Sequence, residues 1–199
     1  DYVQTMKLFI DYVKTLGIDC NKVEGSINFD PYTCALRKGE FCGGGLEKRY
    51  EEMITIMQMV RENIPAFDVV TVNGNVFNNA GAAIVQELAY TLSAANEYMY
   101  NLTSRGVAAH SVGYRMVFSF ATGSNYFMEI AKLRAARLLW TKIVEQYNPK
   151  CQTAYELHIH TESSFYNKTI YDPYVNMLRT TTETMSAAVA GADSISVYP

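Results

Sequence analysis

The residues best suited to chemistry in this chain lie in the run HIHTESS, residues 158–164. On an extended strand, alternate side chains face the same side, so His158, His160 and Glu162 would line one face. Imidazole and carboxylate groups can transfer protons or bind a metal ion. The spacing alone is weak evidence for a metal, because such sites usually also take ligands from elsewhere in the fold. We therefore predict no metal site here.

Amide, hydroxyl and glycine residues dominate the runs that follow the other predicted strands, namely 26–30, 73–79 and 122–125. These groups can hydrogen-bond a ligand, but they carry protons poorly near neutral pH. The triple glycine at 43–45 lacks the Lys-Ser/Thr of a phosphate-binding loop, so we favour a flexible turn. We find no Ser–His–acid or Cys–His–acid arrangement typical of hydrolases, so hydrolase chemistry has no support.

Apolar periodicity predicts helices that alternate with strands along the chain. A helix that begins near residue 46 should end at Ile64-Pro65, because the residue before proline disfavours helical backbone. This alternation indicates an α/β fold with a parallel sheet and right-handed crossovers, in a single domain over 1–199. Periodicity alone leaves an open doubly wound sheet and part of a barrel as alternatives. The predicted helices are 1–16, 46–63, 80–104, 125–146 and 173–190, and the predicted strands are 23–29, 67–72, 116–121, 155–161 and 195–198.

Composition excludes several classes of protein. The chain has 199 residues, of which 49% are hydrophobic and 19% charged, as in a globular domain. Its net charge is −3 with scattered Lys and Arg, which argues against binding to nucleic acid. No apolar run approaches the roughly 18 residues that span a membrane. The four cysteines show no metal-binding spacing, so we predict free thiols in a cytoplasmic protein.

Two longer segments resemble a known family. FMEIAKLRAARLLW (127–140) and DPYVNMLRTTTETMSAAVAGADSISVYP (172–199) are similar to the substrate-binding barrel of the methylmalonyl-CoA mutase family. Members of that family rearrange acyl-CoA carbon skeletons with adenosylcobalamin. The resemblance implies about five strands of an incomplete eight-stranded TIM-type barrel, whose full length is typically about 250 residues. The missing initiator Met suggests an excised fragment, and its open sheet edges predict self-association or truncation from a longer subunit.

The same resemblance implies that the active site is substituted. Catalytic chains carry GYHMQEAG where this chain reads GNVFNNAG (74–81), so Asn75, Val76 and Asn78 replace a Tyr, a His and a Gln. Val cannot donate a hydrogen bond to a thioester oxygen, and losing such a donor often costs roughly 3 kcal/mol of transition-state stabilisation.

Two further segments carry remnants of the substrate pocket. GSINFD (25–30) resembles the family's GSIQND, with Asn28 in place of the Gln. Arg37 falls, after a one-residue gap, near an Arg that pairs with the substrate carboxylate, although we favour a solvated role for it. HIHTESS is similar to a family segment reading RAHCQTSG, in which His160 and Ser164 match and His158 replaces the Arg.

The cobalamin side of the barrel is partly retained. Asn125 and Glu129 match family positions within GSNYFMEIAK (123–132). We favour a structural alternative, in which Glu129 is a first-turn acid and Lys132 its i+3 partner. The Asp-x-His-x-x-Gly motif that ligates cobalt in this family is absent from the sequence. We therefore expect no cofactor in this chain and adenosylcobalamin only in the assembled enzyme.

Some family members are heterodimers of a catalytic large chain and a small chain that keeps the fold and loses the active site. The sequence is identified as part of such a small subunit, with no catalytic residue and with the large subunit as its partner. One alternative is an active acyl-CoA mutase with an altered substrate preference, using Asn75, Asn78 and His160. The other is an unrelated barrel fragment that binds a small ligand through its Asn and Ser loops.

Overall fold

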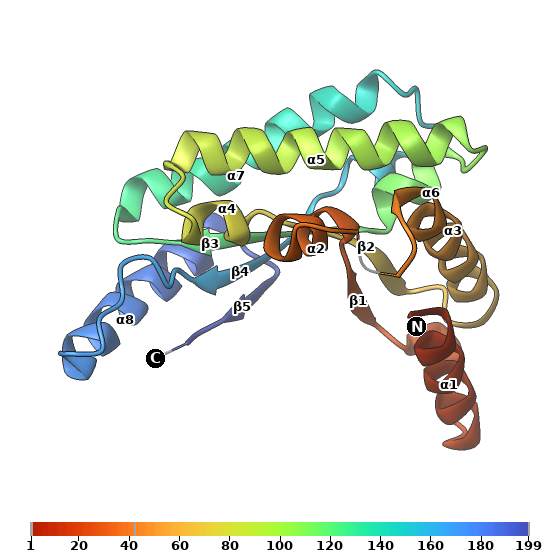
Figure 1. Cartoon of the computed structure of the whole chain (residues 1–199), viewed down its shortest axis with the longest axis horizontal. Coiled ribbons are helices and arrows are strands. Elements are labelled where there is room, and N and C mark those ends of the chain that lie inside the picture. The colour runs from red at the N-terminus through yellow and green to blue at the C-terminus, as the bar shows by residue number, and fades with distance from the viewer. Residues whose placement is uncertain (1, 42, 199) are drawn as a thin grey trace.

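A parallel five-stranded sheet forms the centre of the computed structural model, which describes residues 2–41 and 43–198. The strands lie in sequence order and curl into part of a barrel (Figure 1). This arrangement confirms the predicted α/β fold of an incomplete TIM-type barrel. The strands are β1 (Gly25–Phe29), β2 (Phe67–Asn73), β3 (Met116–Thr122), β4 (His158–Ser163) and β5 (Ser194–Ser196).

Helices connect the strands, and α5 and α7 pass over one face of the sheet (Figure 1). Every neighbouring strand pair is parallel, so each connection crosses over through helical structure. The helices are α1 (Tyr2–Thr15), α2 (Pro31–Lys38), α3 (Leu46–Asn63), α4 (Asn75–Asn79), α5 (Ile84–Ser104), α6 (Ala109–Tyr114), α7 (Tyr126–Glu145) and α8 (Pro173–Ala190), with 3-10 turns η1 (Cys20–Lys22) and η2 (Gln152–Tyr155).

Several predicted boundaries are wrong. The helix predicted over 80–104 begins at Ile84, because Gly81 has φ +97° and separates it from the short helix α4. The strand predicted over 155–161 is His158–Ser163, and the residues before it form η2. Three short helices, α2, α4 and α6, were not predicted. The strand expected over 23–29 begins at Gly25, and the one expected over 195–198 is Ser194–Ser196.

The core lies between the sheet and the helices on its convex side. Phe118 and Phe120 on β3 are fully buried, and Phe118 meets Trp140 of α7 edge to face at 4.9 Å between ring centroids. Burying aromatic side chains of this size contributes roughly 2–3 kcal/mol each before the cost of ordering them. The apolar core therefore lies on the convex side, and the concave side is free for polar groups.

Among the described residues, no helix is long and apolar enough to cross a membrane.

A bulge in β2 decides which side chains reach the concave side. The amides of Val69 and Val70 both donate to the carbonyl of Arg115, at 3.2 and 2.9 Å, so two residues oppose one. The extra residue shifts the alternation of side chains along the strand. Asp68 before the bulge and Thr71 after it consequently line cavities on the same side of the sheet.

The cysteines depart from the prediction of four free thiols. Cys34 is disulfide-bonded, whereas Cys20 and Cys151 are free. Cys42 lies outside the described residues. The prediction is thus wrong at Cys34, because spacing along a sequence does not report which thiols a fold brings together.

Candidate functional site

Polar side chains from all five strands surround a cavity of about 290 Å³ on the concave side of the sheet. The predicted site residues Asn28, Asn75 and His160 line it together, although they are far apart in sequence. Parallel strands bring their carboxyl ends to one edge, and this places the three residues in one cavity. The other lining residues are Ser26, Thr71, Asn73, Val117, Ser119, Glu162, Ser194 and Tyr198.

An amide and carboxylate network closes one side of the cavity. The Asn73 amide nitrogen Nδ2 donates to Asn28 Oδ1 and to Asp30 Oδ2, both at 2.9 Å. Asp30 also accepts from the Asn73 backbone amide at 2.9 Å and from the Tyr98 hydroxyl at 2.6 Å. Asp30 caps α2 as well, accepting from the Thr33 amide at 3.1 Å. This network fixes Asn28, so its side chain is oriented before any ligand arrives.

Asn75 and Glu162 pair with each other across the cavity. Asn75 begins α4 at the end of β2, and its Nδ2 donates to the Glu162 carboxylate on β4. Its Oδ1 is buried and has no hydrogen-bond partner within the described residues. A buried acceptor without a partner costs roughly 1–3 kcal/mol, so this oxygen is suited to a ligand donor such as an amide N–H.

The two histidines of β4 both face the concave side, as their spacing predicted, but in different environments. His160 Nδ1 contacts the Ser194 hydroxyl at 2.7 Å, and burial lowers its pKa. His158 Nδ1 contacts Asp68 Oδ2 at 3.0 Å in a neighbouring cavity of about 390 Å³, and that hydrogen bond raises its pKa. Burial thus favours the neutral form of His160, whereas the contact with Asp68 favours the charged form of His158. Within the described ranges, no group of three or more potential ligands could hold a metal ion.

Asn78 and Ser164 form a buried contact outside the cavity. The Ser164 hydroxyl donates to Asn78 Oδ1 at 2.7 Å, and Asn78 Nδ2 donates to Glu87 Oε2 at 3.4 Å. Both residues are almost fully buried. The pair connects α4 to the loop that follows β4, so its geometry supports a positioning role for these two predicted residues.

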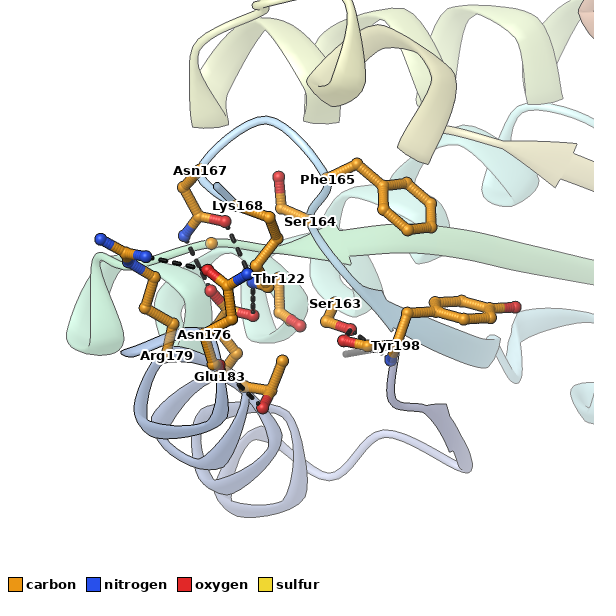
Figure 2. Close-up of polar contacts among 12 residues, drawn as sticks. Thr122, Ser163, Ser164, Phe165, Asn167, Lys168, Asn176, Arg179, Glu183 and Tyr198 are labelled. Atoms are coloured by element: carbon orange, nitrogen blue, oxygen red, sulfur yellow. Dashed lines mark hydrogen bonds and ion pairs between the residues drawn. The ribbon is translucent and has the colours of Figure 1, made fainter. Parts of the chain in front are cut away.

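Glu183 holds the same loop from the other side (Figure 2). This carboxylate of α8 is 1% exposed and accepts from Asn167 at 2.7 Å and from Lys168 at 2.6 Å. The Ser163 hydroxyl at the end of β4 accepts from the Tyr198 amide at 2.7 Å, as Figure 2 also shows. These bonds fix the carboxyl end of β4, where Glu162 and Ser164 lie.

Glu129 belongs to a buried charged cluster. Lys132 Nζ lies 2.6 Å from Glu129 Oε2 and from Glu87 Oε2, and it donates to the Ala121 carbonyl at 2.6 Å. Side chains of the three charged residues are at most 2% exposed. Burial raises the pKa of Glu87, which lies in a cluster with two carboxylates for one ammonium. The predicted i+3 contact of Glu129 with Lys132 is therefore present. Asn125, just before α7, is exposed, and its backbone carbonyl accepts from the Glu129 amide at 2.9 Å.

Comparison with known proteins supplies the family. The sequence model described as methylmalonyl-CoA mutase matches residues 2–199. The chain belongs to the methylmalonyl-CoA mutase family. It is 45% identical over 197 residues to the methylmalonyl-CoA mutase small subunit of Porphyromonas gingivalis, covering 98% of this chain and 31% of that subunit. It is 31% identical over 183 residues to the small subunit of Streptomyces virginiae, covering 92% and 29%.

A further relative is the methylmalonyl-CoA mutase of Cereibacter sphaeroides, 41% identical over 140 residues, which covers 70% of this chain and 20% of that protein. The chain thus spans less than a third of the length of each of these curated relatives. Two small subunits are matched over nearly the whole chain, whereas this mutase is matched over a shorter part.

Besides Asn78, Ser164, Asn125 and Glu129, two more predicted site residues of this mutase-family chain lie apart from the cavity. Arg37 is exposed in the last turn of α2 and does not line the cavity, in keeping with a solvated role. Val76 is partly buried in α4 and does not line it either. The site thus combines some of the positions that the mutase resemblance singled out and omits others.

Sequence reasoning missed several groups in the cavity of this mutase-family chain. Thr71 and Ser119 lie inside strands, where the search for residues after strand ends did not look. Alternation along each strand could have found Ser119, because it is a polar residue in a strongly apolar run. Outside the cavity, Glu87 of the buried charged cluster had no local signal either, since a Glu in an amphipathic helix is usually solvated.

Proposed function

We propose that this chain is part of the small, non-catalytic subunit of a methylmalonyl-CoA mutase, with the catalytic large subunit as its partner. The observation that carries the proposal is coverage: small subunits match 98% and 92% of the chain, and the mutase of Cereibacter sphaeroides matches 70%. In the assembled enzyme, the large subunit would interconvert methylmalonyl-CoA and succinyl-CoA.

The chemistry of the cavity supports a structural rather than a catalytic role. Its amides pair with one another and with carboxylates, as Asn28 does with Asn73 and Asn75 with Glu162. Burial lowers the pKa of His160, whose Nδ1 contacts the Ser194 hydroxyl, and Val76, which lies outside the cavity, offers no polar side-chain group. A thioester oxygen that gains negative charge needs a free, well-placed donor. In this cavity the amide nitrogens of Asn73 and Asn75 already donate to carboxylates, so neither is free.

The residues of this chain do not fit a cobalamin site. The three histidines of the sequence are His110, His158 and His160. His158 and His160 have partners on the concave face, and His110 lies in a different cavity beside α6. Glu129 is in the buried cluster with Lys132. That adenosylcobalamin is bound in the assembled enzyme and not by these residues is part of the proposal.

The test combines assembly with turnover. The chain is co-expressed with its cognate large subunit, the complex is detected by sedimentation velocity, and mutase turnover is measured with adenosylcobalamin for the complex and for each chain alone. The proposal predicts a complex, turnover that requires the large subunit, and no turnover by this chain. Turnover by this chain alone would overturn it in favour of an active acyl-CoA mutase with altered substrate preference.

A matched pair of variants tests whether the cavity is in use. Asn75→Ala removes a cavity amide, and Asn21→Ala removes an exposed amide in η1 that does not line the cavity. A structural role predicts that turnover of the complex is the same for both variants. Loss of turnover with Asn75→Ala alone would show that this cavity takes part in the reaction.

Two further proposals concern association and location. Strands β1 and β5 each pair with one neighbour, so both sheet edges can pair with another chain. Self-association stays a prediction, which light scattering of the isolated chain tests directly; a monodisperse monomer would contradict it. A cytoplasmic location also stays a prediction, to be tested by cell fractionation.

A further inference from the structure

A cavity of about 480 Å³ lies apart from the site on the concave face, between α3, α6 and η2. It shares no lining residue with the 290 Å³ cavity. Its volume falls within the range of about 300–1,000 Å³ that small-molecule sites occupy. The proposed small-subunit role involves none of the residues that line this cavity.

The charged groups that line this cavity are all basic. Arg61 of α3, Arg105 after α5 and Arg115 after α6 contribute guanidinium groups, and no Asp or Glu is among the lining residues. Arg105 pairs with Glu47 at 2.6 Å, but that carboxylate is 80% exposed and lies outside the lining. Arg61 is exposed and has no ion pair or hydrogen bond from its side chain within residues 2–41 and 43–198. The cavity thus presents positive charge without a matching acid.

Arg115 shows most clearly that positive charge in this cavity lacks a lining acid, because its own charge is buried. The residue is 8% exposed, and its Nη1 donates to the Phe67 carbonyl at 2.6 Å. Its guanidinium also lies 5.0 Å from the centre of the Tyr114 ring. The carboxylate of Asp68 acts on it through space, but that carboxylate already accepts from His158. A buried cation without a direct counter-ion is costly, and a bound anion would offset that cost.

The rest of the lining divides into apolar and polar groups. Ile54, Met57 and Val107 contribute apolar surface. His110 and Ser111 of α6 add groups that can donate hydrogen bonds to an anion. An apolar wall beside guanidinium groups suits a molecule that carries an anionic group on an apolar body.

We propose that this cavity binds a small organic anion, a carboxylate or phosphate ester carried on an apolar body. Arg61 and Arg115 would bind the anionic group, and the side chains of Ile54 and Met57 would pack against the body. Fork-shaped guanidinium groups suit both carboxylate and phosphate oxygens.

The test is calorimetric titration of the full chain with four probes: phenyl phosphate, benzoate, inorganic phosphate and benzyl alcohol. We expect saturable binding of phenyl phosphate or benzoate, weaker binding of inorganic phosphate, and no binding of neutral benzyl alcohol. Comparison of phenyl phosphate with benzoate distinguishes the two anionic groups. Failure of the chain to bind a large subunit would leave this result unchanged, so the two proposals fail separately.

A pair of charge-matched variants assigns the binding to the cavity. Arg61→Gln removes an exposed lining guanidinium, and Arg134→Gln removes an exposed guanidinium on α7 that does not line the cavity. We expect Arg61→Gln to raise the Kd about tenfold or more, as loss of a charge-assisted hydrogen bond does, and Arg134→Gln to leave it unchanged. Absence of saturable binding, an unchanged Kd in Arg61→Gln, or an equal loss in both variants would overturn the proposal.

Discussion

Replacing Lys132 by Met should strongly destabilise the chain, because it removes the one cation from a buried cluster of two carboxylates. Lys132 Nζ makes three contacts of 2.6 Å, with Glu87, with Glu129 and with the Ala121 carbonyl. Without it, Glu87 keeps only uncharged donors, the Ala121 amide at 2.8 Å and the Asn78 side-chain amide at 3.4 Å, and Glu129 keeps the Gly123 amide at 3.1 Å. Breaking a buried ion pair from one side typically costs about 3–5 kcal/mol.

The assay is urea unfolding followed by circular dichroism, with a thermal melt beside it. For a chain of this size, a loss of about 3–5 kcal/mol lowers the Tm by roughly 6–20 °C. The control is Lys142→Met, an exposed lysine on the same helix, which should change the free energy of unfolding by less than about 0.5 kcal/mol. Adding Glu87→Gln to Lys132→Met should recover part of the loss, because one unpaired carboxylate is then neutral.

The pH dependence of this variant gives an independent check. Burial raises the folded-state pKa of Glu87 above its ordinary value of 4.5. Its contribution to stability is therefore fully present below pH 4.5 and is lost as the pH rises through the folded-state pKa. Without Lys132 that loss is larger. The deficit of Lys132→Met, meaning the free energy of unfolding that the substitution removes, should therefore shrink as the pH falls toward 4.5. A deficit below about 1 kcal/mol near neutrality, or one that grows in acid, would refute the reasoning.

Three further predictions concern the concave face, a helix contact and a loop. Asp68→Asn should lower the pKa of His158, because Asp68 is the partner that raises it. In the unsubstituted chain the contribution of His158 to stability is present below its ordinary pKa of 6.5 and is lost as the pH rises through the raised value. An unchanged NMR titration of His158 in the variant would contradict this. Gly113→Ala places a Cβ 2.8 Å from a backbone carbonyl of η2 and should cost about 1–3 kcal/mol; an unshifted urea midpoint would count against the contact. Glu183→Ala should speed proteolysis within 164–172, since that loop loses two anchors; equal cleavage rates would disprove the anchoring role.

The sheet and its long helices could be predicted because each repeats an apolar pattern over many residues. The helix over 46–63 and the helix over 173–190 have the predicted bounds. The short α2 was missed although Asp30-Pro31 is a good start signal, with Asp30 capping the Thr33 amide. The six residues of α6 are too few to show a helical period.

The sequence could predict which strand ends line the cavity, but not the contacts that their side chains make there. The rule that ligands gather at the carboxyl ends of parallel strands correctly brought Asn28, Asn75 and His160 together. No local pattern could show that Asn75 would pair with Glu162, 87 residues away. The bulge at Val69 could not be predicted from the sequence either, because it depends on two neighbouring amides of β2 donating to the same carbonyl, that of Arg115.

Binding and catalysis therefore separate in this cavity. A ligand amide can replace the Asn75 amide on the Glu162 carboxylate at little net cost, because one hydrogen bond to a charged group, worth about 1.5–3 kcal/mol, exchanges for another. Catalysis needs more, namely a donor whose strength rises as charge develops on the substrate. Burial lowers the pKa of His160, whose Nδ1 contacts the Ser194 hydroxyl, so a charged imidazolium donor is disfavoured there, which supports the proposed non-catalytic role. If this chain is part of a small subunit, as proposed, calorimetry with methylmalonyl-CoA on the chain alone must be paired with a turnover assay, because heat by itself does not distinguish binding from catalysis.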